Sequence, residues 1–351
     1  MKRAVPPTPA LPPQGGEGGY GNQSKNSPSP LKGEGRGGGE FTRQIFLCAT
    51  LFLSALIAPA SAQAPQPDVA QWQGRRALAD IETLVGFGPR AMDVPGHRKT
   101  IDMIVAEMKK LGVTAREQRW ESTVADQKHA MTNIIAPMYP EAPRRIILGT
   151  HYDSIIRAYA DKDHPDAVMP GANNSASGVA LLLETARALH AQKPPPGVGV
   201  DFIFFDGEEG PISLGAGDPH WQPLGSPYFT AHLAETYPGA KPEQAVIFDM
   251  VCWREMKLHP EQASLLYAAD QIEKYWNIGR TFAPAFFNNQ PTAQPIFDDQ
   301  IALNDAHIPA FLVIGFEYDP WFNTTQDTPD KCSEAALDGV GRTTLRYIYA
   351  H

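Results

Sequence analysis

The chain has 351 residues, of which 42% are hydrophobic and 20% charged, as in an ordinary globular protein. This length accommodates one large α/β domain or two small ones. The formal net charge of −9 at pH 7 argues against a nucleic-acid partner, because such proteins usually carry a basic face.

The first 40 residues are rich in Gly, Pro and Ser. Such a segment buries too little apolar surface to offset the entropy lost on ordering, so residues 1–40 predict a disordered, low-complexity leader. An upstream start that is not the true translation start would give the same pattern.

Residues 41–62 carry the features of a secretory signal peptide. Arg43 precedes the apolar run Ile45–Ile57, and the small residues Ala60–Ala62 follow it. The run is short for a membrane span, which needs about 20 residues. We therefore expect export to the periplasm or the medium, without stable membrane insertion after cleavage, rather than a retained N-terminal anchor.

Residues 63–69 would then be a linker, and residues 70–351 a single folded domain. Apolar residues at helical spacing predict its helices, and short apolar runs bounded by turn residues predict its strands. Their alternation predicts a three-layer α/β/α fold with a mostly parallel central sheet. The predicted helices are Trp72–Val85, His97–Leu111, Ser175–His190, Tyr228–Tyr237, Ser264–Ile278 and Ser333–Ala350. The predicted strands are Thr114–Trp120, Met131–Ala136, Arg144–His151, Gly199–Asp206, Ala245–Val251 and Pro309–Gly315.

Of the three cysteines, Cys48 lies in the signal segment, which leaves Cys252 and Cys332. In an oxidising compartment these two either form a disulfide or remain unconnected thiols, and the sequence leaves both possibilities open. The absence of any C-x-x-C pair excludes a thiolate zinc site.

Polar residues gather where the predicted strands end. In open α/β sheets the chemistry collects beyond the carboxyl ends of the strands. His151 and Asp153 follow one strand, Glu208 and Glu209 follow the next, and Asp249 ends a third. A histidine there can bind a metal while a nearby carboxylate orients its ring. Two adjacent glutamates point apart, so one can bind a metal while the other acts as a general base.

Five sequence blocks occur in a specific order: "GTHYDS", "GANNSASGVALLLETARAL", "VDFIFFDGEEG", "VIFDMV" and "WFNTTQDTPDKC". In this order they resemble the blocks of the zinc aminopeptidase and glutaminyl cyclase superfamily, and most of all its bacterial glutaminyl-peptide cyclotransferase-like members. The resemblance extends from about Phe87 to the C-terminus. It implies a zinc exopeptidase-like catalytic domain over residues 70–351, zinc as the cofactor, and peptide or protein N-termini as partners.

The resemblance also implies roles for individual positions, two of which here carry asparagine. An amide oxygen is neutral and a poor zinc ligand beside imidazole or carboxylate, so metal ligation is expected to be impaired. Asn173 is not a ligand position. The implied roles are His151 and Asp249 on a first metal, Glu209 and Asn323 on a second, Asn174 bridging both, and Glu208 as general base.

Further features resemble the cyclases rather than the aminopeptidases. Trp221 corresponds to a tryptophan that follows the glutamate pair, and Trp321 and Phe322 correspond to an aromatic pocket wall. The family tryptophan falls at Phe322, one residue after the tryptophan of this chain. The resemblance maps a hydrogen-bonding acid onto Asp298, which together with Glu208 and Asp249 would form an acid network that holds a shuttled proton.

Three hypotheses follow. In the first, the protein cyclises N-terminal glutamine to pyroglutamate with release of ammonia. In the second, it is an aminopeptidase that removes N-terminal residues. In the third, it is a metal-free, catalytically weak or inactive relative that binds peptide N-termini.

Overall fold

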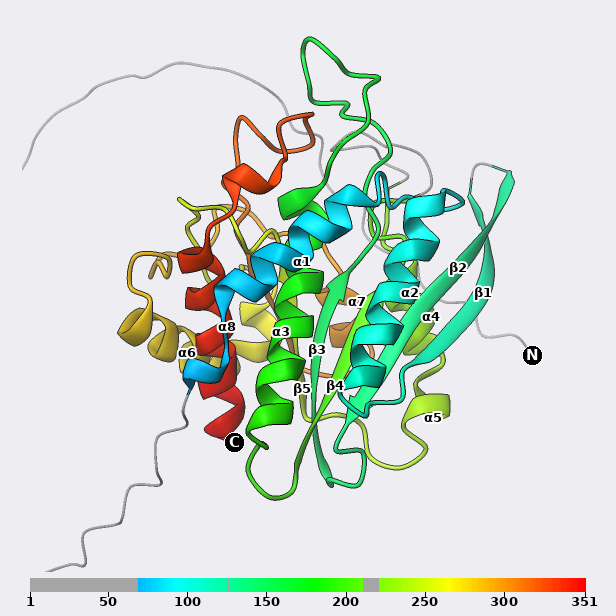
Figure 1. Cartoon of the computed structure of the whole chain (residues 1–351). Coiled ribbons are helices and arrows are strands. Elements are labelled where there is room, and N and C mark those ends of the chain that lie inside the picture. Colours follow the sequence, from blue (N-terminus) through cyan, green and yellow to red (C-terminus); the bar gives the residue numbers. More distant parts are fainter. Residues whose placement is uncertain (1–68, 125, 211–220) are drawn as a thin grey trace, which may run out of the picture. The chain divides into compact units, whose positions relative to one another are not determined.

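A mixed sheet of six strands forms the centre of the fold, in the order β1-β2-β4-β3-β5-β6 (Figure 1). β3, β4, β5 and β6 pair in parallel, whereas β2 is antiparallel to both β1 and β4. The strands are β1 (Arg116–Val124), β2 (Gln127–Met138), β3 (Arg144–His151), β4 (Val198–Phe205), β5 (Gln244–Asp249) and β6 (Ala310–Ile314).

The computed structural model of the chain describes residues 69–124, 126–210 and 221–351. The predicted leader and signal peptide, and the linker up to residue 68, lie outside the described residues. Within the described part, no helix combines the length and the apolar character needed to cross a membrane.

Side chains alternate along the strands between two hydrophobic cores, one on each face of the sheet. On β3, Leu148 enters the first core and Ile147 the second, and on β4, Phe204 and Phe205 divide in the same way. This alternation follows from the two-residue period of a strand. Because both faces are apolar, the sheet needs a helical layer on each side.

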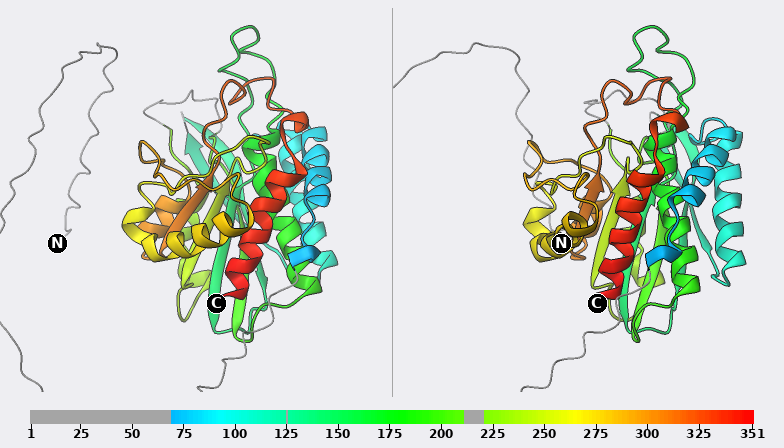
Figure 2. Two further views of the ribbon diagram at one scale, coloured as in Figure 1. Left: turned by 90° about the vertical axis from the view of Figure 1, so that its left-hand side faces the viewer. Right: turned by 60° about the vertical axis from the view of Figure 1, so that its left-hand side comes forward.

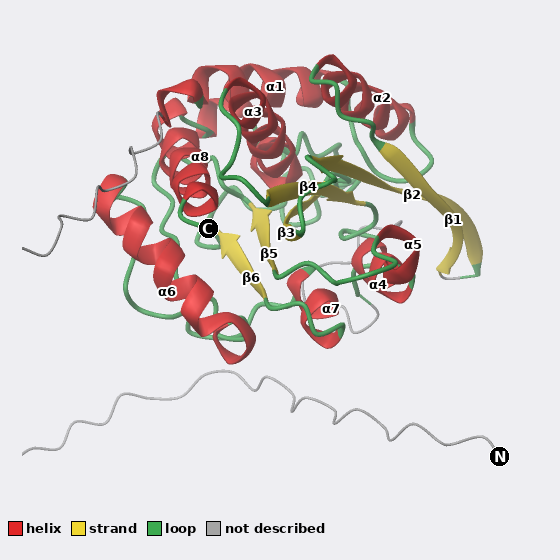
Figure 3. Ribbon diagram, turned by 90° about the horizontal axis from the view of Figure 1, so that it is seen from below, coloured by secondary structure: helices red, strands yellow, loops and turns green. Residues whose placement is uncertain are grey.

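The two layers hold different helices, which confirms the predicted three-layer α/β/α fold (Figure 3). In the first layer α8 packs between α6 and α3 (Figure 2). That layer comprises α1 (Gly74–Gly86), α2 (Pro95–Lys110), α3 (Ser177–Ala191), α6 (Leu265–Phe282) and α8 (Glu334–Tyr349). The second comprises α4 (Gly225–Ala231), α5 (Leu233–Thr236) and α7 (Gln300–Asp305).

Three details differ from the sequence prediction. The predicted helix Tyr228–Tyr237 is two short helices that meet at His232, and α7 was not predicted, because six residues carry too little periodicity. The helix predicted from Ser175 begins at Ser177, after a wide turn over Ala172–Ala176 in which Asn174 is not helical (φ −107°, ψ 92°). This turn is held by hydrogen bonds from distant segments, which local propensity cannot anticipate.

Candidate active site

The predicted site residues converge at the carboxyl end of the sheet. His151 ends β3, Asp249 ends β5, and Glu208 and Glu209 occupy the turn that follows β4. Gly207 opens this turn with φ +72°, a conformation that glycine adopts without steric cost, and so reverses the chain directly after a buried strand. Parallel pairing of β3 with both β4 and β5 places these three chain ends side by side.

His151 lies between two carboxylates and is 1% exposed. Its Nε2 is 3.1 Å from Asp249 Oδ1, within hydrogen-bonding distance. Its Nδ1 is 3.5 Å from Asp153 Oδ1, a charge contact rather than a well-formed hydrogen bond. Burial by itself lowers the pKa of His151, but the two carboxylates outweigh it and raise the pKa well above its ordinary value. The two carboxylates therefore favour the protonated form of the ring.

The main contacts of Asp153 are with the turn that carries Glu208 and Glu209, here called the glutamate turn. Its predicted role of orienting the His151 ring is secondary. Its Oδ1 accepts the backbone N–H of Glu208 at 3.1 Å, and its Oδ2 accepts that of Glu209 at 3.0 Å. With both oxygens engaged by backbone donors, Asp153 fixes the direction in which the two glutamates leave the chain.

Several buried carboxyl groups lie close together at the site. Burial is the main reason that the pKa of Glu208 is raised well above its ordinary value, and the charges of Asp298 and Glu209 raise it further while His151 opposes them. Burial likewise raises the pKa of Asp298 well above its ordinary value, with Asp249 and Asp299 adding to the effect. Burial also raises the pKa of Glu209 to about 7. These carboxyl groups therefore hold a proton more readily than exposed acids do.

The two asparagines at the implied ligand positions form a hydrogen-bonded chain with Glu209. Asn174 Nδ2 donates to Glu209 Oε1 at 2.5 Å and to Asn323 Oδ1 at 3.3 Å. Asn323 Nδ2 in turn donates to the hydroxyl of Tyr159 at 2.6 Å. Asn174 Oδ1 is buried and, in the described part of the chain, accepts no hydrogen bond.

The aromatic residues that were predicted to form a pocket wall lie beside the second core, and their role in a pocket stays a prediction. Trp321 and Phe322 are half-buried against the second core, and Phe322 also contacts Phe316, with ring centroids 6.0 Å apart. Lys331 Nζ lies 4.7 Å from the centre of the Trp321 ring. Trp221 is half-buried and directly follows the undescribed segment 211–220, so its place in the pocket stays a prediction.

Asp327 and Asn173 hold the turn that carries Asn174, although neither residue has a predicted role. The Asp327 carboxylate accepts the backbone N–H groups of Asn173 at 2.8 Å and Asn174 at 3.0 Å. The Asn173 side chain accepts the backbone N–H of Cys252 at 3.0 Å. Asp327 is the acid of the quoted "TTQD" motif, so the motif indicated the residue but not its function.

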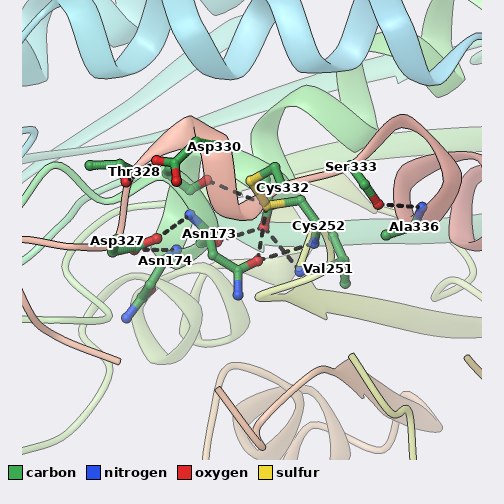
Figure 4. Close-up of a disulfide and its surroundings, with 12 residues drawn as sticks. Asn173, Asn174, Val251, Cys252, Asp327, Thr328, Asp330, Cys332, Ser333 and Ala336 are labelled. Atoms are coloured by element: carbon green, nitrogen blue, oxygen red, sulfur yellow. Dashed lines mark hydrogen bonds between the residues drawn. A yellow bond between two sulfur atoms is a disulfide. The ribbon is translucent and has the colours of Figure 1, made fainter. Parts of the chain in front are cut away.

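The two cysteines whose pairing the sequence left open are joined. Cys252 follows β5 and Cys332 precedes α8, and a disulfide links them directly beside the Asn174 turn (Figure 4). Both are buried. The C-terminal segment that carries Asn323 and Asp327 is thereby covalently joined to the end of β5.

This combination of fold and site defines the α/β class of exopeptidase-like proteins. The pattern of peptidase family M28 matches residues 133–348, and the chain belongs to that family. The expected superfamily is thereby confirmed.

Among curated relatives, the chain is 37% identical to the glutaminyl-peptide cyclotransferase of Bos taurus over 113 residues, which are 30% of this chain and 28% of that protein. The match thus spans little more than a quarter of that relative. Among solved structures, the Tannerella forsythia glutaminyl cyclase has a TM-score of 0.73 and 29% identity over 80% of this chain and 99% of that one. A Zn-dependent exopeptidase from Parabacteroides distasonis has a TM-score of 0.74 and 27% identity over 82% and 100%.

Proposed function

We propose that this protein is a glutaminyl-peptide cyclotransferase-like enzyme, which closes the N-terminal glutamine of a peptide to pyroglutamate and releases ammonia. The observation that carries the proposal is the buried carboxyl trio of Glu208, Asp249 and Asp298 around the buried ring of His151. Similarity to bacterial glutaminyl cyclases over four fifths of the chain supports it.

Ring closure requires a proton shuttle rather than a nucleophilic water. The α-nitrogen of the substrate forms a bond to the side-chain carbonyl carbon, and the bond from that carbon to the amide nitrogen breaks. Glu208 accepts the proton that the α-amine loses and returns it to the departing nitrogen, which leaves as ammonia. Burial raises the pKa of Glu208, which makes its carboxylate a stronger proton acceptor than an exposed glutamate.

The implied zinc fits these residues poorly. Zinc takes imidazole, thiolate and carboxylate ligands, and the implied second metal position offers one carboxylate, Glu209, beside two amides. At the implied first position His151 and Asp249 are good ligands, but the third residue is again the amide Asn174. We infer from this donor set that the native site holds no tight zinc ion.

Polarisation of the substrate amide then depends on hydrogen-bond donors. The site offers the His151 ring, whose pKa is raised by its two carboxylate neighbours, and the second side-chain N–H of Asn323, since Asn174 already donates to Glu209 and Asn323. Such donors stabilise a developing oxyanion, as they do in oxyanion holes. They are weaker electrophiles than a metal ion, so we expect slow turnover.

A second candidate function is the binding of peptide N-termini without chemistry. The hydrogen bond from Asn174 to Glu209 favours it, because this contact satisfies the carboxylate from within the protein. The aminopeptidase alternative has less support, since cutting a peptide bond there would need a metal to activate water.

Export is part of the proposal. The basic residue, apolar run and small-residue exit of residues 41–62 have the pattern of a secretory signal. The Cys252–Cys332 disulfide supports an oxidising compartment, since such bonds are rare in the cytosol. Peptide N-termini in the periplasm or the medium are the expected substrates.

The test compares two peptides that differ only in their first residue. Ammonia release from a Gln-initiated peptide, without release of amino acids from a Leu-initiated one, is the expected result. Amino-acid release from the Leu peptide would establish the aminopeptidase instead. Saturable binding of both peptides without any product would establish the binding function.

A further inference from the structure

The position of the Asn174 side chain depends on a turn that other segments hold with most of its hydrogen bonds. Asn174 interrupts the helical backbone between Ala172 and Ala176. Gly171, which enters the turn, has φ +68°, and a Cβ there would lie 2.6 Å from the carbonyl oxygen of Asn174.

The first holder is the segment that precedes α8. The Asp327 carboxylate accepts two consecutive backbone N–H groups of the turn, from Asn173 and Asn174. The Asp327 carbonyl oxygen accepts a third, from Ala172, at 3.1 Å. Tyr318 donates its hydroxyl to the same carboxylate at 2.9 Å. A buried carboxylate with three donors is satisfied and fixed in place.

The second holder is the segment that follows β5. The backbone N–H of Cys252 donates to Asn173 Oδ1 at 3.0 Å, and that of Val251 donates to Ser177 Oγ at 3.0 Å. Ser177 Oγ in turn donates to the carbonyl oxygen of Asn173 at 2.6 Å. Asn173 is therefore held through its backbone by one segment and through its side chain by the other.

The disulfide joins the two holders. Cys252 belongs to the second, and Cys332 lies five positions after Asp327 in the first. Beside the bond, the backbone N–H of Ser333 donates to the carbonyl oxygen of Cys252 at 2.9 Å. Figure 4 shows Asn173 and Asn174 between Asp327 on one side and Cys252 and Val251 on the other.

We propose that Asn173, Asp327 and the Cys252–Cys332 disulfide form a positioning clamp that sets the Asn174 carboxamide against Glu209. These are positioning residues, because they act on the site through the Asn174 turn. The proposal rests on the proposed function only in assigning Asn174 and Glu209 to the reacting site.

The test reads the Asn174 side chain directly, in the full-length exported protein, and needs no activity. Side-chain amide proton exchange of Asn174 is measured by ¹H–¹⁵N NMR in Asn173→Ala and in the double variant Cys252→Ala, Cys332→Ala. Asn304→Ala is the matched control, because Asn304 is an equally buried asparagine whose Oδ1 accepts the backbone N–H of Ala310 at 2.8 Å, remote from the turn. We expect the Asn174 exchange to accelerate about tenfold in both clamp variants, and less than about twofold in the control.

Asp327→Asn serves if a cysteine variant fails to fold, since it keeps the shape of the side chain but turns one acceptor into a donor. Clamp variants that fold and still exchange the Asn174 side-chain amide at the unmodified rate would overturn the proposal. Failure of the proposed function would appear separately, as missing ammonia release with the exchange result intact. If turnover is measurable, the clamp variants should lower kcat more than they raise KM.

Discussion

The side-chain nitrogen of Asn174 donates a 2.5 Å hydrogen bond to the Glu209 carboxylate. The resemblance to zinc enzymes places two ligands of one metal ion at these positions. A direct bond between donor and carboxylate replaces the attraction that both ligands would have for a cation. The contact gives the Glu209 carboxylate a neutral hydrogen-bond donor within a group of buried acids.

Restoring both ligand types should restore tight zinc binding. We expect stoichiometric zinc by elemental analysis in the double variant Asn174→Asp, Asn323→His. Either single variant and the unmodified protein should bind much less zinc, because one carboxylate beside amides is a weak zinc site. The backbone of Asn323 has φ +53°, a region in which histidine is also found. Stoichiometric zinc in the unmodified protein would contradict the prediction.

Replacing Glu208 by glutamine should remove the proton shuttle. Ammonia release from a Gln-initiated peptide should fall by at least about 100-fold, since a positioned general base contributes that much or more. The exposed Glu235→Gln is the control and should leave the rate unchanged. A Glu208→Gln enzyme that keeps its rate would show that another group moves the proton.

Cutting the disulfide should cost stability as well as position. The bond closes a loop of 80 residues, and removing such a cross-link lowers the free energy of unfolding by about 2–5 kcal/mol. Urea denaturation of Cys252→Ala, Cys332→Ala measures the change. An unchanged midpoint and slope would mean that the cysteines are not paired in the native protein.

Asp161, in the loop after β3, should stabilise the contact with the segment that carries Asn323. We expect this contribution to the stability to depend on pH. Its carboxylate accepts the hydroxyl and, at 3.1 Å, the backbone N–H of Thr325. The Thr325 hydroxyl, helped by backbone N–H groups, lowers the pKa of Asp161 to about 2. A depressed carboxyl pKa adds stability that is present above the unfolded value near 4 and is lost as the pH falls towards 2.

The difference in melting temperature between the unmodified protein and Asp161→Asn isolates this contribution from general acid unfolding. It should be constant above about pH 4 and shrink towards zero near pH 2. A difference that does not change with pH over this range would mean that the carboxylate charge plays no part.

The polar residues at the strand ends could be predicted because the ends of the strands themselves show as local patterns in the sequence. His151, Glu208 and Asp249 each follow a recognisable apolar run, and parallel pairing brings such chain ends together. The function of Asp327 and Asn173 could not be predicted in this way. The backbone partners of Asp327 lie 153 and 154 residues away in the chain, and Cys252, the partner of the Asn173 side chain, lies 79 residues away. No local pattern encodes such contacts.

The sequence by itself determined the α/β fold, the family and the two asparagines where ligands are implied, because periodicity and motif order are local properties of the chain. Only the tertiary structure decided that Cys252 meets Cys332, that Asp153 holds the glutamate turn, and that Asn174 turns its N–H towards Glu209. The physical reason is that each of these contacts closes between segments far apart in sequence. Packing of the whole sheet and its helices, rather than the propensity of any one segment, sets the distances.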